Sequence, residues 1–169
     1  MSAVREVERR RRVIDSVLAR ARALAGQPDA DALQADYARY VCVLASGFIE
    51  RAIAELIIAY VEGKAPRQIR SYLEASLSRL TNVDKERLLR VIGALDAGWR
   101  NEMDLYVVDR RLEALNSVIG LRHDIAHGGG GSLSLHGMET YWKSVQEIID
   151  KLEELLFSNP RPVRPKKKK

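Results

Sequence analysis

The fold class follows from residues 41–60, VCVLASGFIERAIAELIIAY. Apolar residues recur there at helical steps and cover most of the helix circumference, which predicts a helix with neighbours on several sides. The complete helix is expected to begin after a capping aspartate, Asp29 or Asp31, and to end at Tyr60 or Val61. A helix this apolar belongs at the centre of a helical bundle.

Apolar stripes at helical spacing predict further helices on both sides of this central one. Their expected ranges are about 3–25, 66–80, 83–97, 102–126 and 137–157. Thr81 and Asp84 resemble a capping box for the third of these helices, and Gly98 is expected to end it. No convincing alternating run of strand length occurs in the sequence. The prediction is an all-α bundle of about five to six helices, with a single domain over 1–157 and a basic, disordered tail over 158–169.

Composition places the chain among globular proteins. It has 169 residues, of which 46% are hydrophobic and 30% charged, enough for one hydrophobic core. No apolar run approaches the ~18 residues that span a bilayer, and the N-terminus lacks the apolar stretch of a signal peptide. The lone cysteine, Cys42, is expected to be a buried, inert thiol. These features predict a cytoplasmic protein that does not contact a membrane.

The net charge of +5 is unevenly distributed along the chain. Residues 158–169 carry six basic side chains and no acidic one, and the rest of the chain has 22 basic and 23 acidic residues. The folded body is therefore not a basic scaffold for nucleic acid. The tail either attracts RNA, DNA or an acidic protein through salt-sensitive contacts, or it only increases solubility.

Most catalytic templates are absent from the sequence. It contains no GxGxxG or GxxxxGKS/T phosphate loop, no HExxH, no GxSxG and no Cys/His metal spacing. The glycine run at 128–131 follows a predicted helix and does not join a strand to one, so it is not a phosphate loop. The sequence therefore predicts neither a metal site nor a cofactor.

One polar segment stands out, residues 121–128, LRHDIAHG. Leu121 and Ile125 lie four residues apart and are expected to anchor it in the core. Arg122 lies on one face of the helix end, with His127 about 140° further round if the helix continues. The glycines that follow let the helix stop, so that His127 can turn into a cleft. The alternative is structural, because a histidine is favourable near a helix C-terminus and an Arg/Asp pair can be a surface ion pair.

The same segment resembles a known signature. RHDIAH, residues 122–127, is similar to the Arg-x4-6-His motif of the HEPN superfamily, all-helical domains found in prokaryotic toxins and RNases. A polar residue, often asparagine, follows the arginine in that motif, and here it is His123. The apolar helix with SGFIE at 46–50, the motif-bearing helix and a closing helix with tyrosine and tryptophan resemble the RiboL-PSP-HEPN group. The resemblance covers most of 35–157 but does not extend to 66–98 or to the tail.

The resemblance implies a metal-independent endoribonuclease, a toxin or defence effector, that cleaves RNA at a composite site in a homodimer. Arg122 and His127 would be catalytic, since a histidine can act as base or acid near neutral pH and a planar guanidinium matches phosphate oxygens. Attack by the ribose 2′-OH would leave 2′,3′-cyclic phosphate and 5′-hydroxyl ends. His123 and Asp124 are secondary candidates, for substrate contact or for orienting His127. Glu50 is a further candidate for the cleft, with an ordinary surface glutamate as the alternative.

Two other functions stay open at this point. The chain could be a catalytically silent HEPN module that dimerises and binds a partner, although the intact Arg122 and His127 argue against it. It could also be an unrelated helical adaptor that docks on nucleic acid through its basic tail. A nuclease keeps cleaving RNA without the tail, whereas an adaptor cleaves in neither form and loses its RNA binding. An antitoxin or a larger defence complex would be a further partner of a toxin.

Overall fold

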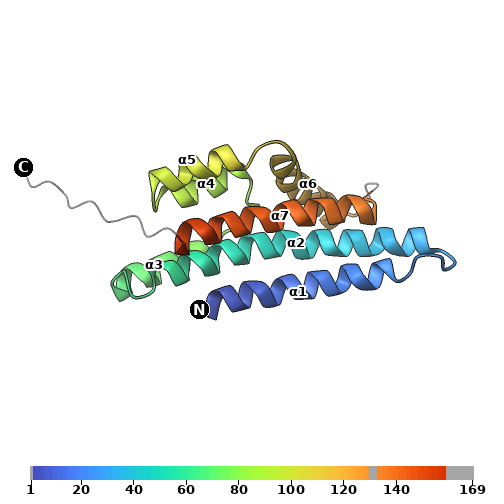
Figure 1. Cartoon of the computed structure of the whole chain (residues 1–169), viewed down its shortest axis with the longest axis horizontal. Helices are drawn as coiled ribbons and strands as arrows, with labels where there is room; N and C mark the ends of the chain where they lie inside the picture. The colour runs from blue at the N-terminus through green and yellow to red at the C-terminus, as the bar shows by residue number, and fades with distance from the viewer. Residues whose placement is uncertain (1, 130–132, 159–169) are drawn as a thin grey trace, which may run out of the picture.

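The computed structural model describes residues 2–129 and 133–158 (Figure 1). These residues form seven α-helices and no strand, which confirms the predicted all-α class. None of these helices is long and apolar enough to cross a membrane. The predicted tail lies outside the described residues except for Ser158. The helices are α1 (Ser2–Arg22), α2 (Ala30–Val61), α3 (Arg67–Leu77), α4 (Lys85–Gly93), α5 (Ala97–Tyr106), α6 (Asp109–Ala126) and α7 (Leu135–Phe157).

The helix predicted at 102–126 is in fact two helices, α5 and α6. α5 begins earlier than expected, because the Asp96 carboxylate accepts a hydrogen bond from the Trp99 backbone N–H at 2.9 Å and caps the helix. Gly98 therefore lies inside a helix and does not end one. The break between α5 and α6 is at Val107, which is fully buried and has φ −86° and ψ 72°. Turning Val107 into the core ends α5 and lets α6 start in a new direction.

Two predicted helix caps also differ from the structure. Asp84 caps α4, since its carboxylate accepts a hydrogen bond from the backbone N–H of Arg87 at 2.7 Å, and Thr81 is not the cap. Asp29 occupies the N-cap position of α2 in a left-handed conformation with φ 58°, and its side chain makes no capping hydrogen bond. The burial of α2 along most of its length stabilises that helix without a side-chain cap.

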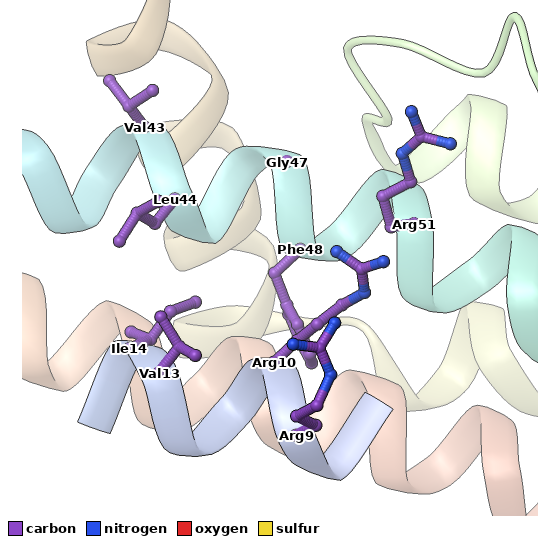
Figure 2. Close-up of a pocket in the computed structure, with 9 residues that line it drawn as sticks. All are labelled: Arg9, Arg10, Val13, Ile14, Val43, Leu44, Gly47, Phe48 and Arg51. Carbon is purple, nitrogen blue, oxygen red and sulfur yellow. The ribbon is translucent and has the colours of Figure 1, made fainter. Parts of the chain in front are cut away.

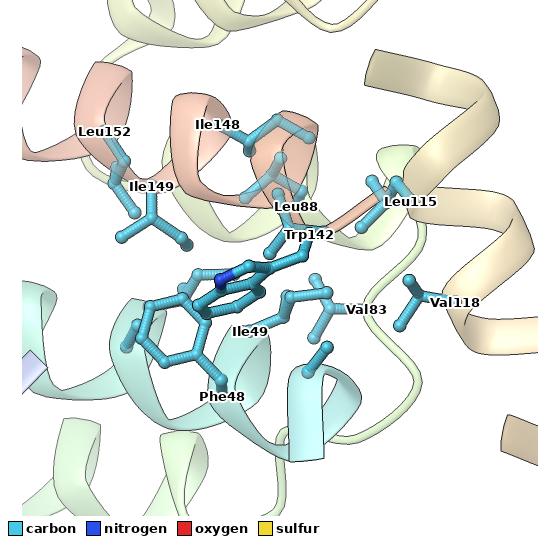
Figure 3. Close-up of a cluster of buried hydrophobic side chains, with 14 of the residues drawn as sticks. Phe48, Ile49, Val83, Leu88, Leu115, Val118, Trp142, Ile148, Ile149 and Leu152 are labelled. Carbon is cyan, nitrogen blue, oxygen red and sulfur yellow. The ribbon is translucent and has the colours of Figure 1, made fainter. Parts of the chain in front are cut away.

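α2 is the central helix, as predicted, and packs against α1, α3, α6 and α7 (Figure 1). Trp142 of α7 meets Phe48 of α2 edge to face, with ring centroids 5.0 Å apart (Figure 3). The indole Nε1 of Trp142 also donates a hydrogen bond to Asp15 Oδ1 of α1 at 2.7 Å. One side chain thus joins three helices, and such an aromatic pair contributes about 0.5–1.5 kcal/mol beyond its buried area.

Contacts between helices give their relative directions. α1 is antiparallel to α2, because Gln34 near the start of α2 donates a hydrogen bond to the carbonyl of Ala21 near the end of α1. α1 is also antiparallel to α7, because Arg22 at its end forms an ion pair with Glu139 near the start of α7. α2 and α7 therefore run parallel to each other.

α6 runs opposite to both of them. At its start, Arg110 and Arg111 form ion pairs with Glu147 of α7 at 2.7 and 2.9 Å, and its end leads directly toward the start of α7. Beside α2, the carbonyl oxygen of Val118 lies 3.5 Å from the Sγ of Cys42. The C-terminal end of α6 therefore points to the end of the bundle where α1 turns into α2 (Figure 1).

We expect Cys42 to be unreactive in the folded protein. Its side chain is fully buried between α2 and α6, and burial raises the pKa of the thiol to about 11. Since the thiolate is the reactive form, labelling by a disulfide reagent at pH 8 should be roughly 10²-fold slower in the native protein than in denaturant. Equal rates in the two conditions would contradict the buried position of this side chain.

Candidate functional site at the end of α6

The polar segment forms the last two turns of α6. Leu121 and Ile125 pack against the hydrophobic core, as expected, and hold this end of the helix on the bundle. Arg122 is half-buried beside them, whereas His123 and Asp124 are exposed. The helix thus presents its polar residues to solvent from a rigid support.

Backbone hydrogen bonds close the helix at His127. The N–H of Gly129 donates to the carbonyl of Asp124 at 2.8 Å, and the N–H of Gly128 donates to the carbonyl of Ile125 at 3.1 Å. This pair of bonds is a Schellman motif, and it requires the left-handed φ of 77° found at Gly128. The helix therefore stops at His127, as the glycines predicted, and the turn of the His127 side chain into a cleft stays a prediction.

The two histidines of the segment lie against each other. Their ring centroids are 4.4 Å apart with an interplanar angle of 60°, as expected for residues four apart on one helix face. His127 is exposed, and its backbone N–H is bonded to the carbonyls of His123 and Asp124. The four-residue spacing of His123 and His127 thus places two imidazoles side by side on one exposed surface.

In the part of the chain that the structure describes, the guanidinium of Arg122 has no acidic partner. Its side chain makes no hydrogen bond or ion pair with any residue within 2–129 and 133–158, and neither does the carboxylate of Asp124. Earlier on the same helix, Arg110 and Arg111 are both paired with Glu147. The surface ion pair between Arg122 and Asp124, which was the structural alternative for this segment, is therefore not formed.

Arg122 and His127 leave the helix in different directions. Five residues separate them, which corresponds to about 7.5 Å along the helix axis and about 140° around it. Within one chain the two groups are therefore on different sides of α6, and their side chains do not converge on one point from the same face.

Glu50 is not brought to this segment. Its Oε1 accepts a hydrogen bond from the backbone N–H of Asn82 at 2.8 Å, which fixes the connection before α4. Glu50 lies two turns beyond Cys42 in one direction along α2, or about 12 Å. Residues 122–127 lie beyond Cys42 in the opposite direction, because α6 is antiparallel to α2 and its Val118 lies beside Cys42. The hydrogen bond to Asn82 gives Glu50 a structural role.

Comparison with known protein families identifies the family of this chain. The sequence model of the RiboL-PSP-HEPN family matches residues 7–158, which is most of the chain and includes the segment 66–98 that the sequence resemblance left out. The chain belongs to the RiboL-PSP-HEPN family. No curated protein and no solved structure matches it.

Membership in the RiboL-PSP-HEPN family is consistent with an RNase or nucleotide-binding role. The polar segment at the end of α6 lies within the matched range, and so do α2 and α7, which hold it in place. In the described part of this RiboL-PSP-HEPN chain, no group of three or more histidine, cysteine, aspartate or glutamate side chains is arranged to hold a metal ion.

This RiboL-PSP-HEPN domain also has a pocket that the sequence reasoning missed. It has a volume of about 300 Å³ and lies between α1 and α2 (Figure 2). Arg51 and two arginines of α1 gather at one end, and apolar side chains form the other. The sequence did contain one sign of this pocket, because Gly47 interrupts the apolar surface of α2. The lining residues are Arg9, Arg10, Val13, Ile14, Val43, Leu44, Gly47, Phe48 and Arg51.

Proposed function

We propose that this protein is a metal-independent endoribonuclease. The observation that carries the proposal is the end of α6, where two exposed imidazoles, His123 and His127, lie against each other. The guanidinium of Arg122 is on the same helix end and has no acidic partner among the described residues. Membership in the RiboL-PSP-HEPN family supports it, since the family is consistent with RNA chemistry. The proposed substrate is RNA, and the proposed setting is a cytoplasmic toxin or defence effector.

The proposed reaction needs no group beyond the chain and the RNA. The ribose 2′-oxygen attacks the adjacent phosphorus, and the bond between phosphorus and the 5′-oxygen breaks. His127 removes the 2′-hydroxyl proton or delivers a proton to the departing 5′-oxygen. The products carry a 2′,3′-cyclic phosphate and a 5′-hydroxyl, so atoms and protons balance without water or a metal ion.

Arg122 is proposed to bind the phosphate. Charge accumulates on the non-bridging oxygens as the phosphorane forms, and a planar guanidinium can donate two hydrogen bonds to them. A guanidinium already paired with a carboxylate would have to give up that partner first. The absence of such a partner within the described residues leaves Arg122 ready for this role.

A second copy of the chain is proposed to complete the site. Because Arg122 and His127 diverge on their own helix, one chain offers one group or the other to a given phosphate more easily than both. Two chains supply two arginines and two histidines, which provides a base, an acid and positive charge together. His123 and Asp124 are proposed to contact substrate or to orient His127. An antitoxin or a defence-complex protein is the further partner proposed for such an effector.

RNA cleavage should survive removal of divalent ions. We expect the same rate of cleavage of a single-stranded RNA with and without excess EDTA, because the proposed acid, base and phosphate ligand are all side chains. Mass spectrometry of the products should find 2′,3′-cyclic phosphate ends. Loss of activity on chelation that one divalent ion restores would contradict the assignment of acid–base chemistry to His127.

Deletion of residues 159–169 separates this proposal from its alternatives. A nuclease retains cleavage after the deletion, because the proposed site lies on α6. An adaptor that docks through its tail cleaves in neither form and loses RNA binding. A silent RiboL-PSP-HEPN module cleaves in neither form while keeping its oligomeric mass.

A further inference from the structure

The pocket between α1 and α2 is apolar at one end and cationic at the other. Val13 and Val43 line the apolar end and are 50% and 42% exposed, and the buried ring of Phe48 lies in the wall (Figure 2). Apolar side chains left open to water favour an occupant that covers them. Three arginines gather at the other end (Figure 2). An occupant would therefore combine an apolar body with an anionic group.

Gly47 keeps the apolar end of the pocket open. A Cβ built on this residue would meet nothing within 4 Å, so close packing within the chain does not require a glycine there. Glycine is also unfavourable in the interior of a helix, and Gly47 lies in the middle of α2. Because Gly47 lines the pocket, a larger side chain at this position would take up part of its volume. The glycine thus costs helix stability and leaves room for a ligand.

The arginine end carries one positive charge more than its acidic partners. Glu6 forms ion pairs with Arg9 at 2.6 Å and with Arg10 at 3.1 Å. Glu55 forms an ion pair with Arg10 at 3.0 Å, so three guanidiniums share two carboxylates. Arg51 makes no hydrogen bond or ion pair with any residue that the structure describes, and the Nε of Arg10 is a buried donor without an acceptor. The excess charge and the free donors fit a head group with one negative charge, such as a carboxylate.

The walls of the pocket favour a hydrocarbon body for this ligand. Apart from the three arginines, none of the lining side chains carries a polar group. The backbone groups of α1 and α2 are used by the hydrogen bonds of the helices themselves. A nucleobase buried against these walls would leave polar edge atoms unpaired, which is costly, whereas a hydrocarbon chain has no such atoms. The walls therefore select a hydrocarbon chain over the base of a nucleotide.

The size of the pocket limits the length of that chain. Val43 and Arg51 are eight residues apart on α2, which corresponds to about 12 Å along the helix axis. An extended chain advances about 1.2 Å per bond, so roughly ten atoms span this distance. The volume of about 300 Å³ agrees, since it holds roughly ten groups of the size of a water molecule. Both measures correspond to a chain of about eight to ten carbons that includes its head group.

We propose that this pocket binds a medium-chain fatty acid, with its carboxylate at the arginine end and its hydrocarbon chain beside Gly47. A carboxylate accepts two parallel hydrogen bonds from a guanidinium, and Arg51 can donate them without giving up another partner. The site is separate from the proposed ribonuclease site. Cys42, which contacts α6, lies about 140° from Gly47 around α2. Fatty-acid binding therefore does not depend on the ribonuclease function.

A series of straight-chain carboxylates tests the length of the pocket. In calorimetric titrations of the full chain, each added CH₂ from hexanoate to decanoate should tighten binding roughly fourfold, because each is removed from water. Dodecanoate should bind no more tightly than decanoate, since the pocket is then full. Octanol, which has the chain of octanoate without its charge, should bind roughly tenfold more weakly than octanoate.

Arg51→Gln tests recognition of the head group. It should weaken octanoate roughly tenfold through the lost charged hydrogen bonds, and leave the binding of octanol nearly unchanged. A variant that only damaged the pocket would lose both ligands. Arg12→Gln is the matched control, because Arg12 is exposed on α1, does not line the pocket and has no partner within the described chain. It should bind octanoate like the wild type.

Gly47→Leu tests the apolar end. The leucine side chain should fill this end, so saturable binding of both octanoate and octanol should be lost. Helicity and melting temperature should not fall, because leucine favours a helix and its Cβ meets no other atom. Gly120→Leu on α6 is the matched control, since a Cβ there also meets nothing within 4 Å. It should bind octanoate like the wild type.

The fatty-acid site would be overturned by the absence of saturable decanoate binding at millimolar concentration, or by equal affinity along the series. Wild-type affinity for octanoate in Arg51→Gln or Gly47→Leu would overturn it as well. Displacement of octanoate by adenosine monophosphate would assign the pocket to a nucleotide, and a lower oligomeric mass in Gly47→Leu would assign it to a protein interface. Sedimentation with phosphatidylglycerol vesicles without binding of the soluble acids would assign it to a membrane. None of these measurements uses a cleavage assay, so their failure leaves the ribonuclease proposal to its own tests.

Discussion

His127→Ala should lower the rate of RNA cleavage roughly 10²–10⁴-fold, the usual size of a general acid–base contribution. The imidazole is exposed at the end of α6, and the hydrogen bonds that close the helix there come from the backbone. The fold should therefore be unchanged, with wild-type helicity and oligomeric mass. The measurement is the single-turnover cleavage rate of a labelled RNA at saturating protein.

His136→Ala is the matched control for this variant. His136 is also exposed near a helix end, at the start of α7, and lies outside the proposed site. The His136→Ala variant should cleave RNA at the wild-type rate. Toxicity on expression should be lost in His127→Ala and retained in His136→Ala. Cleavage by His127→Ala at the wild-type rate would show that the histidine is structural and would favour the silent-module alternative.

Arg122→Ala should reduce cleavage by a similar order, through lost stabilisation of the phosphorane. Arg122→Lys should recover only part of the rate, because an ammonium keeps the charge but cannot form the two parallel hydrogen bonds of a guanidinium. The half-buried stem of Arg122 also packs at the edge of the core, so the lysine variant preserves most of that packing. Both rates are to be compared at equal helicity and oligomeric mass.

Arg12→Ala provides the control for the loss of a positive charge. Arg12 is exposed on α1 and has no hydrogen-bonded or ionic partner within the described chain. It should leave cleavage unchanged, which separates a specific phosphate contact from a general effect of net charge. Equal activity in Arg122→Ala and wild type would remove Arg122 from the reaction. If the alanine variants unfold, Arg122→Lys and His127→Gln take their place.

Long-range packing explains where the predicted helices differ from the observed ones. The periodicity of residues 102–126 fits one helix, and nothing local marks the break at Val107. That break depends on burying Val107 in the core, together with the early start of α5 at the Asp96 cap. By contrast, α2 is apolar on so much of its surface that its central place was predictable.

The same distinction applies to the site residues. Arg122, His123 and His127 are close in sequence on one helix, so their association could be predicted from spacing alone. Glu50 could not be placed in this way, because its partner, Asn82, is 32 residues away and is brought to it by the path of the chain between α3 and α4. The stop of the helix at His127 was also predictable, because glycines follow it and Gly128 adopts the left-handed conformation of the Schellman motif.

The sequence by itself determined the all-α class, the central position of α2 and the polar segment at the end of α6, because helical periodicity and motif spacing are local properties of the chain. Only the tertiary structure decided that Arg122 has no acidic partner among the described residues and that α1 and α2 enclose a pocket beside Gly47. Both depend on which helix faces meet. Val43 and Ile49 are both apolar, yet Ile49 is buried in the core and Val43 is exposed, because Val43 lies at the open pocket between α1 and α2.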